Sequence, residues 1–338
     1  MVEGFAGRTH ILGVGVATPD NVVTNDDLSG VMETSDEWIE QRTGIRERRH
    51  ISADCSATDL GKIAAEQALA KAGVGIGDID AIVFATLSPD MDWPSSAALL
   101  AAKLKAPAIP AFDVKNQCSG FIYSLSTADA LIRAGRARHV LVVGGEIHST
   151  GLDLTTRGRE VAVIFGDGAG AVVLGPSPSA EHGILSTHLH AQGKFAEKLW
   201  LEAGARRRRP HLTEEDLDGE DPPVFPRMHG RYVFKHAVTR FPEVIREALD
   251  WNGLGVEDLD LLIPHQANLR INQFVAAELG LEESQVVNNI QRYGNTTAAS
   301  IPIALHEAIG DGRIGPGKLV CLAAFGAGFT WASALLRW

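Results

Sequence analysis

The chain has 338 residues, 45% of them hydrophobic and 22% charged, which suits a soluble globular protein built from two fused α/β halves. A formal net charge of −11 argues against broad nucleic-acid binding, because neutralising phosphates requires a basic face. The three cysteines make no disulfide framework, the N-terminal stretch lacks a signal-peptide pattern, and no run approaches the roughly 20 apolar residues of a membrane span. We expect a cytoplasmic protein with reduced thiols that binds neither nucleic acid nor membranes.

Strand-like and helix-like segments alternate through residues 1–180, which we expect to form one α/β unit. Short, nearly all-apolar runs predict buried strands, and apolar residues spaced three or four apart predict helices. The predicted strands span residues 80–86, 139–144, 160–165 and 170–174. The predicted helices span residues 57–72 and 120–134.

Residues 181–234 are expected to connect this unit to a second α/β unit, residues 235–338. Within the connection, residues 194–231 are rich in charge and proline and predict a long loop or lid. The second unit's predicted strands span residues 259–263, 318–323 and 330–336, and its helices span 235–251, 269–279 and 300–309. Similar segments starting at Gly75 and Gly255 precede a strand in each unit, which indicates a duplicated fold.

Cys118 lies where an extended segment gives way to small residues and a helical pattern. A thiol at a helix start meets free backbone N–H groups and the helix dipole, which can lower its pKa to roughly 3.5–7.5. The sequence therefore predicts a nucleophile. The alternative, an inert core thiol, suits Cys55 and Cys321 better, because Ser119 and Gly120 leave room beside Cys118.

Two further segments could complete a Cys–His–Asn site for thioester chemistry. His265 follows a predicted strand and a proline, and should project from the strand's carboxyl end. Asn295 lies in a Gly-Asn-Thr-Thr segment, where it could equally be a turn residue. The glycine-rich run 325–329 predicts a tight hairpin that could aim a backbone N–H at an oxyanion. No cluster has metal-ligand spacing.

Seven sequence blocks between about Ile11 and Trp338 resemble the β-ketoacyl-acyl carrier protein synthase III family, whose members initiate bacterial type II fatty-acid synthesis. The blocks are Thr34-Ser-Asp-Glu-Trp-Ile, Arg42-Thr-Gly-Ile-Arg-Glu-Arg, the Cys118 region, Phe165-Gly-Asp-Gly-Ala-Gly-Ala, Pro264-His-Gln-Ala-Asn-Leu-Arg, Gly294-Asn-Thr and Phe325-Gly-Ala-Gly-Phe-Thr-Trp. The resemblance implies a thiolase fold, with two pseudo-symmetric α/β halves in α-β-α-β-α layers, and a homodimer.

The resemblance also implies a reaction, a decarboxylative Claisen condensation of a short-chain acyl-CoA with malonyl-acyl carrier protein. Cys118 would carry the acyl group, and the backbone N–H groups of Cys118 and Ala327 would form the oxyanion hole. His265 and Asn295 would stabilise the enolate formed as carbon dioxide leaves. The products would be 3-oxoacyl-acyl carrier protein, CoA and carbon dioxide, with the CoA thioester as a substrate and no cofactor or metal.

Further binding residues follow from the same resemblance, although each could otherwise be a packed or surface residue. Trp38, Arg42, Arg157 and Asn268 would contact CoA or its pantetheine arm. Lys235 and Arg270 would contact the carrier protein. Trp93, reaching in from the other subunit, and Phe325 would border the acyl pocket, and the size of Trp93 predicts a short primer.

The chain departs from the family at the expected carrier-protein docking helix, where Ala277 and Glu278 replace basic residues. We hypothesise that Arg206–Arg209 supplies replacement charge. Two other functions stay open: an acyltransferase of specialised metabolism with another acceptor, and a catalytically silent thiolase-fold partner. A degradative thiolase normally uses a second cysteine in its chemistry. This function fits less well, because Cys321 lies inside a predicted strand.

Overall fold

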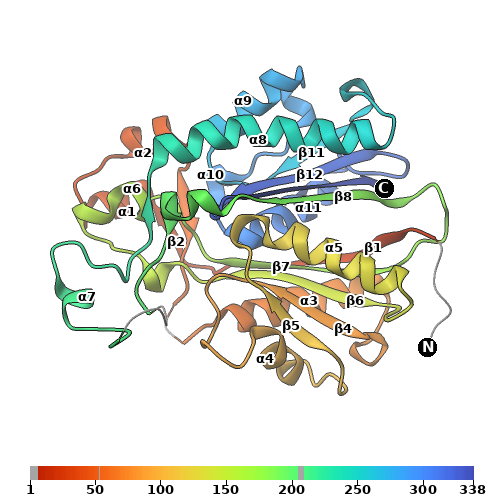
Figure 1. The fold of residues 1–338 in the computed structure, drawn as a ribbon, viewed down its shortest axis with the longest axis horizontal. Coiled ribbons are helices and arrows are strands. Elements are labelled where there is room, and N and C mark those ends of the chain that lie inside the picture. Colours follow the sequence, from red (N-terminus) through yellow and green to blue (C-terminus); the bar gives the residue numbers. More distant parts are fainter. Residues whose placement is uncertain (1–6, 53, 205–208) are drawn as a thin grey trace.

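A computed structural model describes residues 7–52, 54–204 and 209–338, and its main elements form five layers (Figure 1). The first sheet has the strand order β1-β7-β6-β4-β5, and the second has the order β11-β12-β13-β8. The first sheet contains β1 (Thr9–Ala17), β4 (Ala81–Ala85), β5 (Ala111–Val114), β6 (Val140–Glu146) and β7 (Gly168–Pro176). The second sheet contains β8 (Gly183–Ala191), β11 (Leu261–Pro264), β12 (Leu319–Gly326) and β13 (Thr330–Arg337).

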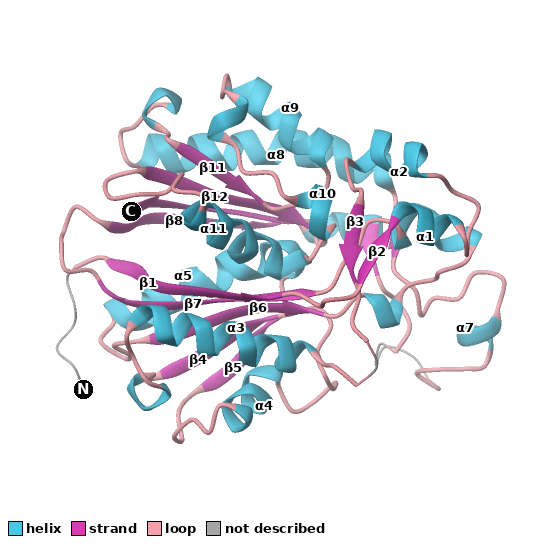
Figure 2. Cartoon of the chain, turned by 180° about the vertical axis from the view of Figure 1, so that it is seen from behind, coloured by secondary structure: helices cyan, strands magenta, loops and turns pink. Residues whose placement is uncertain are grey.

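Helices cover both outer faces and fill the space between the sheets, as Figure 2 shows from behind. The inner layer consists of α5 (Gly120–Arg133) and α11 (Ser300–Gly310). The outer layers consist of α3 (Ala57–Ala72) and α4 (Ser96–Lys103) on the first sheet, and α8 (Gly230–Trp251) and α9 (Leu269–Leu279) on the second. This is the expected α-β-α-β-α arrangement.

The core lies between the two sheets, because both inner helices are apolar on more than one side. Phe121, Ile122 and Leu125 of α5 are fully buried among β-branched residues of the central strands. Fully burying such a side chain contributes about 1.5–3 kcal/mol, so this layer fixes the starts of α5 and α11 firmly. The predicted site residues Cys118 and Asn295 lie shortly before the starts of α5 and α11, respectively.

The two predicted units repeat one local structure, which confirms the similarity seen between their sequences. Gly75 precedes a single 3-10 turn, and its backbone N–H donates to Asp78 Oδ2 at 2.8 Å. Gly255 and Asp258 form the same contact at the same distance before β11. In both units a strand then runs into its sheet, as expected for a duplicated α/β fold.

Smaller elements form a cap at one end of the layers. They are α1 (Asn25–Ser29), α2 (Asp36–Thr43), α6 (Arg159–Ala162), α7 (Glu215–Asp218), α10 (Ile290–Tyr293) and the two-stranded pairs β2 (Val22–Thr24) with β3 (Glu47–Arg49) and β9 (Leu199–Trp200) with β10 (Arg227–Met228). The glycine that ends α2, Gly44, has a φ of 78°. A Cβ there would lie 2.4 Å from Leu269 Cβ, so glycine permits α2 to contact α9.

Three expectations about the elements were wrong. Residues 160–165 are not a strand: α6 occupies their start, because Ala162, Val163 and Phe165 pack in the cap cluster and not in a sheet. Residues 194–231 are not a plain loop, since they contain β9, α7 and β10 and the first residues of α8. Residues 183–191, expected within the connection, form β8 and pair with β13.

Candidate active site

Cys118 lies in a single 3-10 turn, Gln117–Ser119, between β5 and α5. The residue before it, Gln117, has a φ of 46°, which is uncommon for a non-glycine residue and sharply turns the chain. Cys118 is 6% exposed and borders a cavity of about 600 Å³. The predicted position of the thiol at a helix start is therefore confirmed.

The turn between β12 and β13 approaches the thiol closely. A Cβ on Gly326 would lie 2.8 Å from Cys118 Sγ and 2.5 Å from Cys118 Cβ, so only glycine fits there without a shift. The backbone N–H groups of Ala327 and Cys118 donate toward the sulfur and lower its pKa. The two expected oxyanion-hole donors thus both face the sulfur of Cys118.

The predicted low pKa of Cys118 is wrong. Burial, and secondarily the charge of Glu146, raise the pKa of the thiol to about 12. The two N–H donors act in the opposite direction but do not outweigh the loss of water. Cys118 therefore rests as a thiol and has to lose its proton when it reacts.

His265 follows β11 directly and is fully buried. Its Nδ1 lies 2.6 Å from Ser300 Oγ, at the start of α11, whereas its Nε2 is buried without a hydrogen-bond partner among the described residues. Burial, with a smaller contribution from nearby His148, lowers the pKa of His265 to about 3, so the imidazole is neutral. A neutral imidazole with one free nitrogen can form a hydrogen bond with a substrate.

Asn295 is 5% exposed and borders the same cavity as Cys118. Its backbone N–H donates to Ile164 O at 2.8 Å, and Gly166 N–H donates to its carbonyl at 3.1 Å. Its Oδ1 accepts a hydrogen bond from Thr297 N–H at 2.8 Å. Because Oδ1 already accepts this hydrogen bond, the amide NH2 group is the part of the Asn295 side chain that can donate to a ligand.

Five of the other predicted residues border this cavity. Trp38 is half-buried with the guanidinium of Arg42 4.3 Å from its ring, and Phe325 lies deeper and is 3% exposed. Asn268 and the exposed Arg270 complete the set. Asn268 has a structural task as well, since it caps α9 through Arg270 N–H and donates to Arg42 O at 2.9 Å.

Five predicted residues do not border the cavity, and two of them, His265 and Ala327, are described above. Arg157 lines an adjoining hollow with Trp200 and forms an ion pair with Asp153 at 2.6 Å. Lys235 is exposed on α8, and Trp93 is 78% exposed in the loop between β4 and α4. Arg206–Arg208, the main part of the proposed replacement charge, lie outside the described residues.

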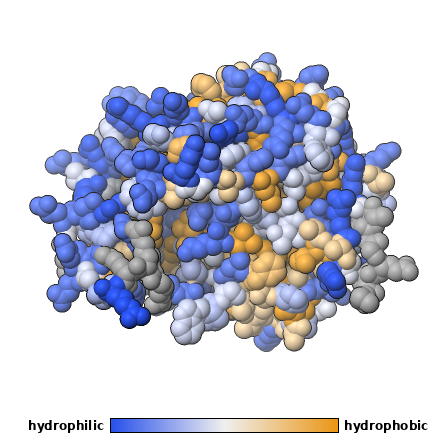
Figure 3. Space-filling model, viewed as in Figure 1, coloured by the Kyte–Doolittle hydropathy of each residue, from blue (hydrophilic) through white to orange (hydrophobic). Residues whose placement is uncertain are grey.

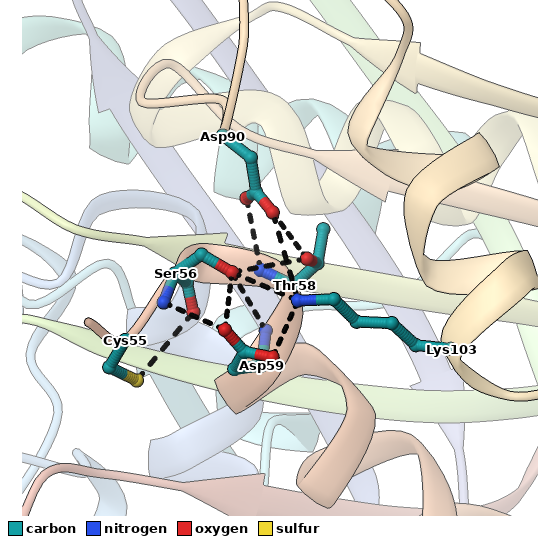
Figure 4. Close-up of polar contacts among 6 residues, drawn as sticks. All are labelled: Cys55, Ser56, Thr58, Asp59, Asp90 and Lys103. Carbon is teal, nitrogen blue, oxygen red and sulfur yellow. Dashed lines mark hydrogen bonds and ion pairs between the residues drawn. The ribbon is translucent and has the colours of Figure 1, made fainter.

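The loop that carries Trp93 is anchored on the opposite side of the first sheet from the second sheet. Asp90 accepts hydrogen bonds from the backbone N–H and the hydroxyl of Thr58, at the start of α3 (Figure 4). Lys103 lies between two carboxylates, 2.5 Å from Asp59 and 4.0 Å from Asp90. These contacts fix the loop three residues before Trp93.

Sequence reasoning missed four polar residues around the triad: Ser300, Thr297, His148 and Glu146. Glu146 is fully buried at the end of β6 and accepts hydrogen bonds from Leu87 and Ser88. Burial raises its pKa to about 7. Thr297 and Ser300 lie shortly after the Gly294-Asn-Thr block, but no local pattern links His148 or Glu146 to it. Among the described residues, no group of histidine, cysteine or carboxylate side chains is arranged for a metal ion.

The two sheets, the duplicated units and a buried cysteine at the start of an inner helix define a thiolase-fold protein. Models of 3-oxoacyl-[acyl-carrier-protein] synthase III match residues 112–193, and models of its C-terminal part match residues 249–338. The β-ketoacyl-[acyl-carrier-protein] synthase III of Rhodospirillum centenum is 47% identical over 337 residues, covering 98% of this chain and 99% of that protein. The chain therefore belongs to the β-ketoacyl-[acyl-carrier-protein] synthase III family.

Solved structures of this family have the same fold. The synthase III of Aquifex aeolicus superposes with a TM-score of 0.89 at 44% identity, covering 98% of this chain and 100% of that one. The synthase III of Thermus thermophilus gives a TM-score of 0.89 at 41% identity, covering 97% of this chain and 99% of that one.

In the described part of this chain, no helix has the length and apolar character needed to cross a membrane.

Proposed function

We propose that this protein condenses a short-chain acyl-CoA with malonyl-acyl carrier protein, releasing CoA and carbon dioxide. One observation carries the proposal: in a chain similar along its whole length to synthase III enzymes, Cys118 meets two backbone N–H donors beside a cavity that Asn295 also borders. The specialised-metabolism alternative is less well supported, since curated relatives that are 46–48% identical along the chain carry the synthase III name, whereas the priming β-ketosynthase of the R1128 polyketide pathway is 35% identical.

In the first half-reaction, Cys118 Sγ attacks the thioester carbonyl. The N–H groups of Cys118 and Ala327 stabilise the resulting oxyanion, and losing one such donor typically costs about 100- to 1000-fold in rate. The thiol proton leaves with the CoA sulfur as the carbon–sulfur bond breaks, so the acyl group remains on Cys118. This transfer suits a cysteine that rests as a thiol.

In the second half-reaction, the malonyl carbon–carbon bond breaks and its electron pair becomes an enolate. Gln266 N–H donates to Ser300 Oγ at 3.4 Å, so the Ser300 hydroxyl proton is free to bond His265 Nδ1. The imidazole proton is then on Nε2, from which it stabilises the enolate together with the Asn295 amide. The carbanion attacks the acyl group, and the Cys118 thiolate leaves and takes a proton from solvent.

Substrate binding uses the residues that border the cavity. Trp38, Arg42 and Asn268 contact the CoA thioester or the pantetheine arm, and Arg157 reaches it from the adjoining hollow. Lys235 and Arg270 contact the acidic carrier protein, since both are exposed cations and Arg270 stands at the cavity wall. The CoA thioester is consumed as a substrate, and no bound cofactor or metal takes part.

A homodimer that pairs the edges of the first sheet completes the acyl pocket. The edge strand β5 is half-buried throughout, and Figure 3 shows apolar surface gathered over β5 and α5. Met91 and Trp93, in the neighbouring loop, are 53% and 78% exposed. Unpaired edge strands favour pairing with a second copy, and a twofold dimer uses one patch twice. Light scattering should give twice the chain mass; a monomer would contradict this part.

The protein works in the cytoplasm, where CoA thioesters and carrier proteins are available to it. The free thiols of Cys55, Cys118 and Cys321 support a reducing compartment.

The proposed activity is tested by incubating the protein with acetyl-CoA and malonyl-acyl carrier protein and recording the intact mass of the carrier protein. A 3-oxobutyryl carrier protein that is absent with Cys118→Ala is expected. An unchanged malonyl carrier protein with every acyl-CoA tried would refute the proposal.

A further inference from the structure

A buried histidine outside the predicted triad lies beside Asn295. His148 follows β6, and its backbone N–H donates to Asp167 Oδ1 at 2.7 Å. Its ring Nε2 lies 2.8 Å from Thr297 Oγ1, and its ring packs against Phe165 in a tilted arrangement, with centroids 4.6 Å apart and an interplanar angle of 36°. His148 therefore touches two residues that themselves contact Asn295.

Both of these residues hold Asn295 in place. Thr297 donates its backbone N–H to Asn295 Oδ1 at 2.8 Å, and its hydroxyl lies 3.5 Å from the same oxygen. Phe165 pairs with Asn295 in a one-residue parallel bridge. Thr297 has a φ of 48°, which a β-branched residue rarely adopts without external support. The contact with His148 is one such support.

The His148 ring is in a protonation state that allows it to support Thr297. Burial lowers the pKa of His148 to about 4, so the ring is neutral, although Asp167 opposes this shift and His50 adds to it. When Nε2 carries the ring proton, it donates to Thr297 Oγ1 and leaves the hydroxyl proton for Asn295 Oδ1. Both Thr297 donors then face Oδ1, so the amide NH2 group of Asn295 is directed to the cavity.

We propose that His148 is a positioning residue which, through Thr297, orients the Asn295 amide for the condensation step. The inference rests on the proposed function, in which Asn295 acts only on the malonyl thioester. The rate of condensation should therefore depend on His148, whereas the rate of loading of Cys118 should not.

The test compares His148→Leu, which keeps the bulk of the side chain, with His148→Gln, whose terminal amide can still reach Thr297. Acetyl loading of Cys118 and discharge by malonyl-acyl carrier protein are timed separately by intact mass, and thermal unfolding is recorded. Losing one neutral hydrogen bond predicts a roughly three- to tenfold slower discharge for His148→Leu, with loading unchanged. His148→Gln should recover most of the discharge rate.

Thr297→Val removes the hydroxyl that links the two side chains, and it tests the same contact should His148→Leu not fold. The double variant His148→Leu with Thr297→Val should discharge no more slowly than Thr297→Val alone, because Thr297→Val has already removed the contact with His148. His188→Leu, a buried histidine on β8 that contacts Ser186, serves as the control and should change neither rate.

Equal slowing of loading and discharge, an unchanged discharge in His148→Leu, or additive losses in the double variant would each overturn the inference. Failure of the proposed function gives a different result, because the unsubstituted protein would then fail to load Cys118 or to discharge it. The two failures are therefore distinguishable in one set of samples.

Discussion

Replacing Gly326 with alanine would put a methyl group against the proposed nucleophile. Gly326 has no left-handed φ, so alanine can adopt its backbone conformation and the change is purely steric. The new Cβ would lie 2.5 Å from Cys118 Cβ, 2.8 Å from Sγ and 3.2 Å from the Cys118 backbone nitrogen. Real Cβ atoms do not approach so closely, so either the cysteine or the β12–β13 turn must move.

Either movement separates the sulfur from the backbone N–H of Ala327. Losing one oxyanion donor costs about 100- to 1000-fold, so acyl loading of Cys118 should slow by that order. Overpacking of a dense core costs about 1–3 kcal/mol of unfolding free energy. Gly326→Ala should therefore be folded, less stable and almost inactive in loading.

The assay is the rate at which acetyl-CoA adds an acetyl mass to the protein, measured with thermal unfolding. Gly310→Ala is the matched control, because a Cβ on this last residue of α11 meets nothing within 4 Å. The control should load normally and unfold no earlier, since alanine favours helix. Loading by Gly326→Ala at the unsubstituted rate would refute the geometry described for Cys118 and the β12–β13 turn.

Three further predictions follow from the same site. The rate at which iodoacetamide alkylates Cys118 should rise about tenfold per pH unit between about pH 7 and pH 10, because the pKa of the thiol is about 12 and the reactive thiolate is a small, growing fraction in this range. A plateau of the rate near neutrality would contradict this. Ser300→Ala removes the 2.6 Å partner of His265 Nδ1 and should slow discharge by malonyl-acyl carrier protein roughly tenfold without slowing loading, as timed by intact mass. Acetyl-CoA should load Cys118 faster than octanoyl-CoA if Trp93 limits the acyl pocket, and equal loading would show that it does not.

The sequence predicted the layers and the position of the thiol well, because these depend on local patterns. Cys118 lies between a short strand and an inner helix as expected, and His265 follows its strand directly. Residues 160–165 misled the prediction, since an apolar, β-branched run reads as a strand whether it packs in a sheet or, as here, in a separate cap cluster.

The environment of the site was harder to predict, because it is made by residues far apart in the chain. The pKa of Cys118 depends on burial and on Glu146, neither of which is visible in the residues around the cysteine. His148 contacts Thr297 across 149 positions of sequence. Trp93 is exposed in a single chain, so its predicted place at the acyl pocket requires the partner subunit and stays a prediction.

The most direct test of the central claim is a single-turnover experiment on Cys118. The protein is loaded with acetyl-CoA, freed of excess CoA ester, mixed with malonyl-acyl carrier protein and followed by intact mass of both proteins. We predict an acetyl mass on Cys118 that disappears as the 3-oxobutyryl carrier protein appears, and neither species with Cys118→Ala. An acetyl mass that malonyl-acyl carrier protein cannot remove would contradict the condensing activity and favour a different acceptor.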